Sequence, residues 1–175
     1  MLQQFKDKGN DNMVQKLKKA PVSLSEDIPR DYLLLRDKAM HSLRIGTMRN
    51  MKSVITGIFF PSLGFREYTL KEKINLWVGK SRSGVSCLLK TMLKTDLSQS
   101  VTELQIPVYF FHGIYDYTCC CSVAESYFLK IKAPIKGFYR FEQSAHSPIF
   151  EEPGKMQKII REDVLKGTNK LADLK

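Results

Sequence analysis

Two residues in the C-terminal third of the chain could carry out acid–base chemistry together. Asp116 follows the apolar segment 106–112, and His146 follows the segment 136–141. Imidazole groups titrate near neutral pH and can act as general bases. A carboxylate that binds one ring nitrogen of a histidine fixes the orientation and tautomer of the ring. The pair therefore predicts the supporting half of a nucleophilic triad, provided that the fold brings the two residues together.

Each of these residues also has a structural interpretation. Asp116 could stabilise the start of a helix near Thr118, because aspartate favours turns. His146 could simply occupy a turn before Pro148. His112 ends the first apolar segment, and we expect it to pack in the fold instead of reacting.

The other candidate nucleophiles and ligands carry weaker signals. The consecutive cysteines 119–121 have neither zinc-site nor CxxC spacing, and we expect them to be buried in the first turn of a helix. Segment 79–84, GKSRSG, differs from a G-x-S-x-G nucleophile elbow because its second glycine comes one residue late. It also follows a helix-like segment, so we interpret it as a flexible loop. We expect no nucleophile in this chain, no cofactor and no metal.

The elements that must position Asp116 and His146 indicate a parallel sheet. We expect a strand over 106–112, a helix over 119–131, a strand over 136–141 and a helix over 151–165. The first strand, IPVYFFH, is apolar enough to be buried on both faces. Alternating strands and helices predict an α/β fold whose strands end at the same edge of the sheet. We therefore expect Asp116 and His146 to meet.

The first hundred residues indicate helices separated by loops. Helical segments are expected over 1–19 with a break at GND, and over 29–41, 48–60, 68–77 and 85–93. Thr69 and Glu72 form a capping-box pattern, which predicts a helix start. We expect Trp77, the single tryptophan, to fill the core of this helical region.

Composition narrows the class of protein. The 175 residues are 43% hydrophobic and 26% charged, which is typical of a globular chain and excludes collagen-like and wholly disordered classes. No run approaches the roughly 18 apolar residues of a membrane helix. The N-terminus lacks the apolar core of a secretory signal and the cysteines form no disulfide framework, so we expect a cytoplasmic protein. The net charge of +10 is spread along the chain without a nucleic-acid-binding motif, and we attribute it to solvated helix surfaces.

The stretch PVYFFHGIYDYT…GFYRFEQSAHSPIFEEP resembles the end of the α/β-hydrolase fold, and is most like the cytoplasmic group related to proline iminopeptidases. The family pattern is a strand, HGxxD, a helix, a strand and a small-residue loop with a histidine. The resemblance implies that Asp116 is the triad acid and His146 the triad base. The preceding helices resemble the cap of that family, including SLSEDIPRDYLLLRDKAM and MRNMKSVITGIFFPSLGFREYTLKEKIN.

The resemblance implies a domain division and an activity. It implies a helical cap over 1–104, the C-terminal part of the hydrolase core over 105–167 and a polar tail over 168–175, which we expect to fray. It implies a serine hydrolase of ester or amide bonds, with aminopeptidase activity among the options. In this family the N-terminal core strands and the nucleophile elbow precede the cap, and we find neither here. We therefore expect a fragment or truncated member that is inactive alone.

Two further function classes stay open at this point. A non-catalytic interaction protein derived from a hydrolase would expose strand 106–112 without its usual neighbour, which invites self-association. A basic nucleic-acid-binding protein is the less favoured alternative. As partners we expect a small-molecule or peptide substrate once the missing core is supplied, and no membrane.

Overall fold

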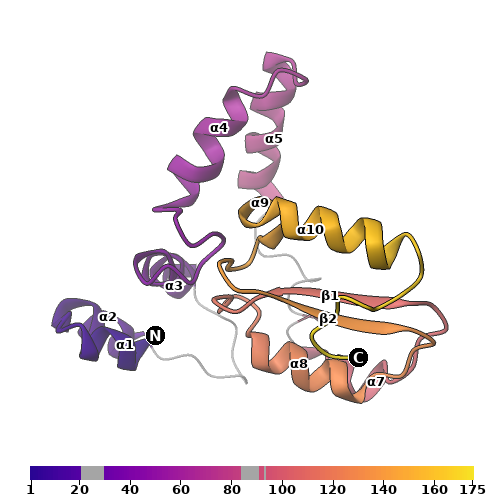
Figure 1. Cartoon of the computed structure of the whole chain (residues 1–175). Helices are drawn as coiled ribbons and strands as arrows, with labels where there is room; N and C mark the ends of the chain where they lie inside the picture. The colour runs from indigo at the N-terminus through magenta and orange to yellow at the C-terminus, as the bar shows by residue number, and fades with distance from the viewer. Residues whose placement is uncertain (21–29, 84–90, 93) are drawn as a thin grey trace. The chain divides into compact units, whose positions relative to one another are not determined.

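The computed structural model describes residues 1–20, 30–83, 91–92 and 94–175, which form two compact units (Figure 1). Unit 1 comprises Met1–Asn50 and Leu97–Lys175, and unit 2 comprises Met51–Asp96. Unit 1 therefore combines the N-terminal helices with nearly the whole C-terminal half of the chain. The predicted division into a cap over 1–104 and a core over 105–167 concerns the roles of these parts and stays a prediction.

Unit 1 contains a two-stranded parallel sheet, β1 (Val108–Gly113) and β2 (Lys136–Phe141), joined by helix α8 (Cys121–Lys130). The α/β class and the parallel pairing are therefore confirmed. Strand β2 has its expected bounds. Strand β1 begins later than expected, directly after Pro107, which has no amide hydrogen to donate to a ladder. All of β1 except Gly113 is half-buried, so the expectation of burial on both faces is wrong.

Helix α8 covers one face of the sheet (Figure 1). The ring of Phe128 from α8 packs edge-on against Phe110 of β1 and Phe138 of β2, with ring centroids 5.6 and 5.5 Å apart. Phe110 and Phe138 are aligned in the parallel register, so their side chains leave the sheet on the same face. Phe128 and Phe138 are fully buried, and they form the centre of this layer.

The closing helical segments cover the other face of the sheet (Figure 1). They are α9 (Pro148–Glu151), α10 (Pro153–Ile159) and the π-helical turn η2 (Ile160–Val164), in place of the single helix expected over 151–165. Side chains on this face of β2 pack against those of α10. The buried members of this core are Tyr139, Phe141, Met156 and Ile159. Pro153 begins α10, where its missing amide hydrogen is not needed.

The C-terminal tail is bound to the outer edge of β2. The amide of Phe138 donates to the Leu174 carbonyl at 3.0 Å, and the amide of Asp173 donates to the Phe138 carbonyl at 2.9 Å. The buried carboxylate of Asp163 accepts hydrogen bonds from the amides of Lys170 and Leu171 at 2.8 and 2.7 Å. The expectation of a fraying tail is therefore wrong, because composition alone does not reveal a buried acceptor for the amides of the tail.

The N-terminal helices of unit 1 have a core of their own. Helices α1 (Leu2–Asp7), α2 (Asp11–Lys19) and α3 (Arg30–Ser42) contribute to it with the residues that follow α3. Its buried members are Phe5, Met13, Val14, Ala39, Met40, Leu43 and Ile45. The expected break at GND is confirmed, because Asn10 caps α2 by accepting a hydrogen bond from the Met13 amide at 3.1 Å. A short helix, α7 (Leu97–Ser100), precedes the sheet.

In the described part of the chain, the main elements of unit 2 are the π-helical segment η1 (Ile55–Phe59) and the helices α4 (Phe60–Leu63) and α5 (Leu70–Ser83). The capping box before α5 is confirmed. The Thr69 amide donates to Glu72 Oε2 at 2.8 Å, and the Glu72 amide donates to Thr69 Oγ1 at 3.3 Å. The Thr69 hydrogen bonds lower the pKa of the Glu72 carboxyl.

Three expectations for this region need correction. Residues 48–53 are not helical, so the segment expected over 48–60 begins late. The loop expected over 79–84 is wrong for 79–83, which belong to α5, and Gly84 lies outside the described residues. The helix expected over 85–93 falls almost entirely outside the described residues. Trp77 packs within unit 2, since its ring lies 4.8 Å from that of Phe59, but it is only half-buried.

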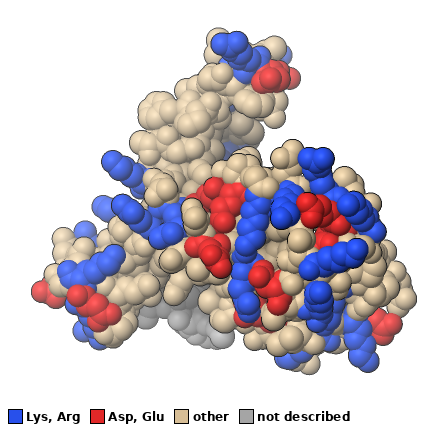
Figure 2. All heavy atoms as spheres, viewed as in Figure 1, with Lys and Arg blue, Asp and Glu red and all other residues tan. Residues whose placement is uncertain are grey.

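Unit 2 exposes most of its apolar side chains. Met51 is its one fully buried hydrophobic residue among those described. The exposed set comprises Ile55, Ile58, Phe60, Leu63, Phe65, Tyr68, Leu70, Ile74, Leu76, Val78 and Met92. Figure 2 shows the surface around α4 as mainly uncharged, whereas basic side chains lie among acidic ones around α10. No described helix is both long and apolar enough to cross a membrane.

Candidate active site

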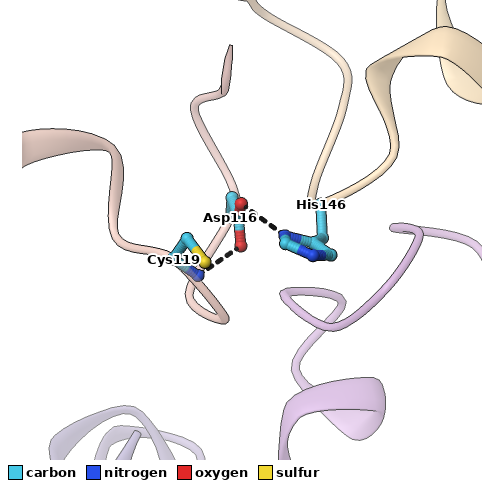
Figure 3. A group of neighbouring side chains, drawn as sticks. All are labelled: Asp116, Cys119 and His146. Atoms are coloured by element: carbon cyan, nitrogen blue, oxygen red, sulfur yellow. Dashed lines mark hydrogen bonds and ion pairs between the residues drawn. The ribbon is translucent and has the colours of Figure 1, made fainter. Parts of the chain in front are cut away.

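Asp116 and His146 are joined by a hydrogen bond beyond the carboxyl ends of the two strands (Figure 3). His146 Nδ1 donates to Asp116 Oδ2 over 2.8 Å. The Asp116 side chain is 5% exposed, whereas that of His146 is 41% exposed. The ring is thus held from its buried side, and its other nitrogen, Nε2, stays available to an incoming group. The structure brings the two predicted residues together, while their catalytic role stays a prediction.

The turn after β1 fixes the Asp116 carboxylate. Asp116 Oδ1 accepts hydrogen bonds from the amides of Thr118 at 2.8 Å and Cys119 at 3.0 Å, while the Asp116 amide donates to the Gly113 carbonyl at 3.1 Å. Both carboxylate oxygens therefore have partners. The turn role and the role of orienting His146 are compatible, because each uses a different oxygen.

The main chain of β1 approaches the histidine loop closely at Gly113. A Cβ atom at this position would collide with the carbonyl oxygens of Ser144 and Ala145. Two residues further on, the Tyr115 amide donates to the Ser144 carbonyl at 3.2 Å. Glycine at 113 is therefore needed for the two loops to touch, which places Asp116 within reach of the histidine loop.

Two glutamates at the end of α9 anchor the histidine loop. Glu151 accepts hydrogen bonds from the amides of Ala145 at 2.8 Å and Arg49 at 2.6 Å. Glu152 accepts a hydrogen bond from the Gln143 amide at 3.0 Å. The sequence interpretation placed this acidic pair only at the start of a helix. Its anchoring role was missed, because a pattern of acidic residues does not reveal which amides they will bind.

The segment that follows α3 also borders the site. The carbonyl oxygen of Gly46 accepts a hydrogen bond from the His146 amide, and that of Ile45 accepts one from the Tyr117 amide, both over 3.4 Å. Sequence reasoning missed this contribution, because nothing in the local sequence links residues so far apart.

His112 packs in the sheet, as expected, but it also lies near the carboxylate. Its ring stacks on Phe138 with centroids 6.0 Å apart, and its side chain is 11% exposed. His112 Nε2 lies 4.0 Å from Asp116 Oδ2, beyond hydrogen-bond range. Of the two histidines near Asp116, only His146 is both hydrogen-bonded to the carboxylate and open to solvent.

The three consecutive cysteines differ from the expectation. Cys119 and Cys120 are exposed and Cys121 is half-buried, so the prediction of a buried helical turn is wrong. The turn around Asp116 binds the Cys119 amide, and α8 begins only at Cys121. Partial burial and the negative charge of Asp116 raise the pKa of the Cys119 thiol. Partial burial and Glu125 raise the pKa of Cys121 to about 11. Neither cysteine is therefore prepared as a thiolate nucleophile.

No described residue hydrogen-bonds to His146 Nε2, so a nucleophile for this base is not found in the described part of the chain. Ser81, the serine of the near-elbow segment that most resembles a nucleophile position, lies within α5. Its hydroxyl donates to the Val78 carbonyl at 2.8 Å, as serines inside helices commonly do. The rejection of segment 79–84 as a nucleophile elbow is thus supported by its helical conformation up to Ser83.

Comparison with known proteins gives a partial match. A protein of Bacillus subtilis (strain 168) named a probable aminopeptidase, YbaC, is 26% identical to this chain over 107 residues. The match covers 61% of this chain but only 33% of that protein. No protein-family model matches the chain, and no solved structure matches it. The chain is therefore similar to one part of a protein that is named as a probable aminopeptidase.

Proposed function

We propose that this chain supplies the acid and the base of a serine-hydrolase triad in an α/β-hydrolase of the aminopeptidase-like type. The observation that carries the proposal is the 2.8 Å hydrogen bond between Asp116 and His146, beyond the ends of two neighbouring parallel strands. The similarity to a protein named as a probable aminopeptidase supports an amide or ester bond as the target. The helical parts that precede β1 then correspond to the cap.

In the proposed reaction, His146 Nε2 accepts the proton of a serine hydroxyl as its oxygen attacks the substrate carbonyl. The same nitrogen then returns the proton to the leaving amine or alcohol as the acyl–enzyme forms. Asp116 holds the Nδ1–H bond and stabilises the imidazolium between these two steps. The burial of Asp116 and the exposure of His146 suit these roles, because the carboxylate orients the ring and the substrate approaches from the open side.

We further propose that the serine nucleophile comes from outside this chain, because the sequence contains no G-x-S-x-G elbow. We therefore expect no triad-dependent turnover from the chain alone. The purified chain should form no stable adduct with a fluorophosphonate probe, as detected by intact-protein mass spectrometry. The purified chain should also show no enzymatic hydrolysis of ester substrates. A serine adduct that disappears in His146→Ala would contradict this part of the proposal.

The triad role itself can be tested by complementation. The chain is co-expressed with the portion of the Bacillus relative that lies outside the matched region, and hydrolysis of amino-acid anilides is measured. We expect activity that is lost in His146→Ala and falls by about ten-thousand-fold in Asp116→Asn, which leaves the ring in the wrong tautomer. Asp37→Asn is the matched control, since that carboxylate is 52% exposed and contacts His41 instead. Full activity in the His146 variant would overturn the proposal.

A second candidate function is self-association through β1. Among the described residues, β1 pairs only with β2, and the tail covers the other edge of the sheet. The Val108 amide donates toward β2, to the Ile135 carbonyl at 2.9 Å. The main-chain groups of Tyr109 and Phe111 therefore point to the open edge, because this direction alternates along a parallel strand. An open edge of this kind favours pairing with another copy.

Sedimentation velocity distinguishes this candidate from a monomeric chain. We expect species larger than the monomer, which Ile106→Lys should shift toward the monomer by placing a charge just before the start of β1. Leu129→Lys is the matched control, because Leu129 and Ile106 are 66% and 64% exposed and Leu129 lies on α8. A monomeric wild-type chain, or an equal effect of both substitutions, would contradict pairing through β1.

A further inference from the structure

We propose that Asp116, Cys119 and His146 form a binding site for a zinc-type divalent cation. One carboxylate oxygen, one thiol sulfur and one ring nitrogen of these residues lie within 4.8 Å of one another (Figure 3). Zinc commonly takes three such protein ligands from oxygen, sulfur and nitrogen donors and completes its tetrahedron with water. The proposal differs from the expectation of no metal site, which stays untested.

The turn around Asp116 creates this cluster. Because Asp116 Oδ1 accepts the Cys119 amide hydrogen at 3.0 Å, the chain folds back and places the Cys119 side chain beside the carboxylate. The loop after β2 adds His146 from 30 residues further along the chain. The three ligands come from two different loops. Common zinc patterns have two ligands a few residues apart in the sequence, so no zinc pattern is visible here.

The geometry needs only small movements to bind a metal. Around a tetrahedral zinc with nitrogen and oxygen bonds of about 2.0–2.1 Å, the Asp116 Oδ2 to His146 Nδ1 separation would be about 3.3 Å. It is 2.8 Å in the structure. The sulfur would lie about 3.6 Å from each of these atoms. Cys119 and His146 are exposed and can adjust, while Asp116 is buried and already held by two amides.

Metal binding and the proposed reaction exclude each other. Coordination by Nδ1 displaces the hydrogen that Asp116 holds, so the neutral ring carries its hydrogen on Nε2, and the Cys119 thiol releases its proton to solvent. A ring protonated at Nε2 cannot accept a proton from a serine. This inhibitory consequence rests on the proposed triad function, whereas the metal site itself does not.

The test uses the full chain with a phosphine reductant in place of a thiol. Zn²⁺ affinity is measured by competition with a chromophoric chelator, and Cd²⁺ is added to detect the thiolate-to-metal charge-transfer absorption. We expect one equivalent to bind, and we expect Cys119→Ser to weaken binding at least tenfold and to abolish the cadmium absorption. Cys120→Ser is the matched control, because Cys120 is the adjacent exposed cysteine and should leave both signals unchanged.

His146→Ala should also weaken Zn²⁺ binding at least tenfold, with far-ultraviolet circular dichroism confirming that the variant is folded. The proposal is overturned if the wild-type chain binds no zinc, if Cys119→Ser binds as tightly as wild type, or if Cys120→Ser loses as much affinity as Cys119→Ser. The last result would show that the three consecutive cysteines bind zinc together, without the proposed arrangement of Asp116, Cys119 and His146. These measurements need no activity, so failure of the triad complementation and failure of metal binding are separate results.

Discussion

Two buried aspartates of unit 1, Asp116 and Asp163, organise the residues around them in similar ways. Asp116 and Asp163 are 4% and 0% exposed. Each carboxylate accepts hydrogen bonds from two main-chain amides and from one ring-bearing side chain, and Asp163 also accepts one from the Thr168 hydroxyl. The ring partner of Asp116 is His146 at 2.8 Å, and that of Asp163 is Tyr139 at 2.9 Å. The local chemistry is therefore nearly the same at both places.

The two aspartates differ in what their ring partners leave available. Tyr139 is fully buried and has a single polar atom, which the hydrogen bond to Asp163 occupies. The His146 side chain is 41% exposed and has a second ring nitrogen that no described residue binds. A buried carboxylate alone therefore does not indicate a site for chemistry. The partner must also present an atom that can still react.

The Asp163 cluster contributes to the fold through its ionised carboxylate. Burial acts to raise the pKa of Asp163, but hydrogen bonds from Thr168, Leu171, Tyr139 and Lys170 outweigh it and hold that pKa below its usual value. Burial and the Asp163 carboxylate together raise the pKa of Tyr139. The charged form of Asp163 therefore fits its surroundings, in spite of complete burial.

The largest expected effect comes from removing the Asp163 carboxylate. Asp163→Ala should lower the free energy of unfolding by about 3 kcal/mol or more, because it leaves the Tyr139 hydroxyl and two tail amides without their acceptor. Urea unfolding followed by circular dichroism measures this, and faster hydrogen exchange at the Lys170 and Leu171 amides locates it. Unchanged exchange at these amides would contradict the role of Asp163 in binding the tail.

Asp116→Ala should have a smaller effect on stability, about 1–2 kcal/mol. The substitution removes the acceptor of two amides in an exposed turn and of the half-exposed His146 ring. Water can then bind these groups, which limits the loss. The same urea titration gives the value. A loss equal to that of Asp163→Ala would remove the distinction between an aspartate that stabilises the fold and one that mainly orients His146.

Tyr139→Phe should lower the free energy of unfolding by about 1 kcal/mol. It deletes one hydrogen bond to Asp163 but leaves the donors from Thr168, Lys170 and Leu171 in place, and the ring keeps its packing. Tyr109→Phe is the matched control, because the buried Tyr109 hydroxyl has no partner among the described residues. The control should be neutral or stabilising, and a greater loss there than at Tyr139 would refute the assignment.

Acid should weaken the fold through Asp163 by less than these substitutions do. The folded-state pKa of Asp163 is lowered, so its contribution is fully present above the unfolded pKa of about 3.9 and is lost as the pH falls through the folded value. The urea midpoint should therefore decrease as the pH falls below about 4. Asp163→Asn should show a shallower decrease, and an identical slope in both proteins would exclude Asp163 as a contributor.

The sequence predicted features that depend on neighbouring residues or on a motif. The capping box of Thr69 and Glu72 is confirmed by its reciprocal hydrogen bonds, and β2 has its predicted bounds. The pairing of Asp116 with His146 was expected because parallel strands end at the same edge of a sheet. Each of these inferences required only a local pattern and a general rule of topology.

Features that depend on distant contacts were missed. The polar tail appeared free because nothing in its composition points to Asp163, which buries its charge only when the tail amides surround it. The exposure of Cys119 likewise follows from a turn that binds its amide before α8 begins. The hydrophobicity of a residue type predicts its average burial. It does not predict which main-chain amides a nearby carboxylate will bind.

The close approach at Gly113 has a consequence for variation and engineering of the site. The spacing between the loops that carry Asp116 and His146 depends on a contact between main-chain atoms of Gly113 and the Ser144–Ala145 segment. This contact leaves no room for a side chain at residue 113. Surrounding side chains can therefore be exchanged while the distance between Asp116 and His146 is preserved. Conversely, the addition of a single methyl group at residue 113 should separate the pair without touching either of its members.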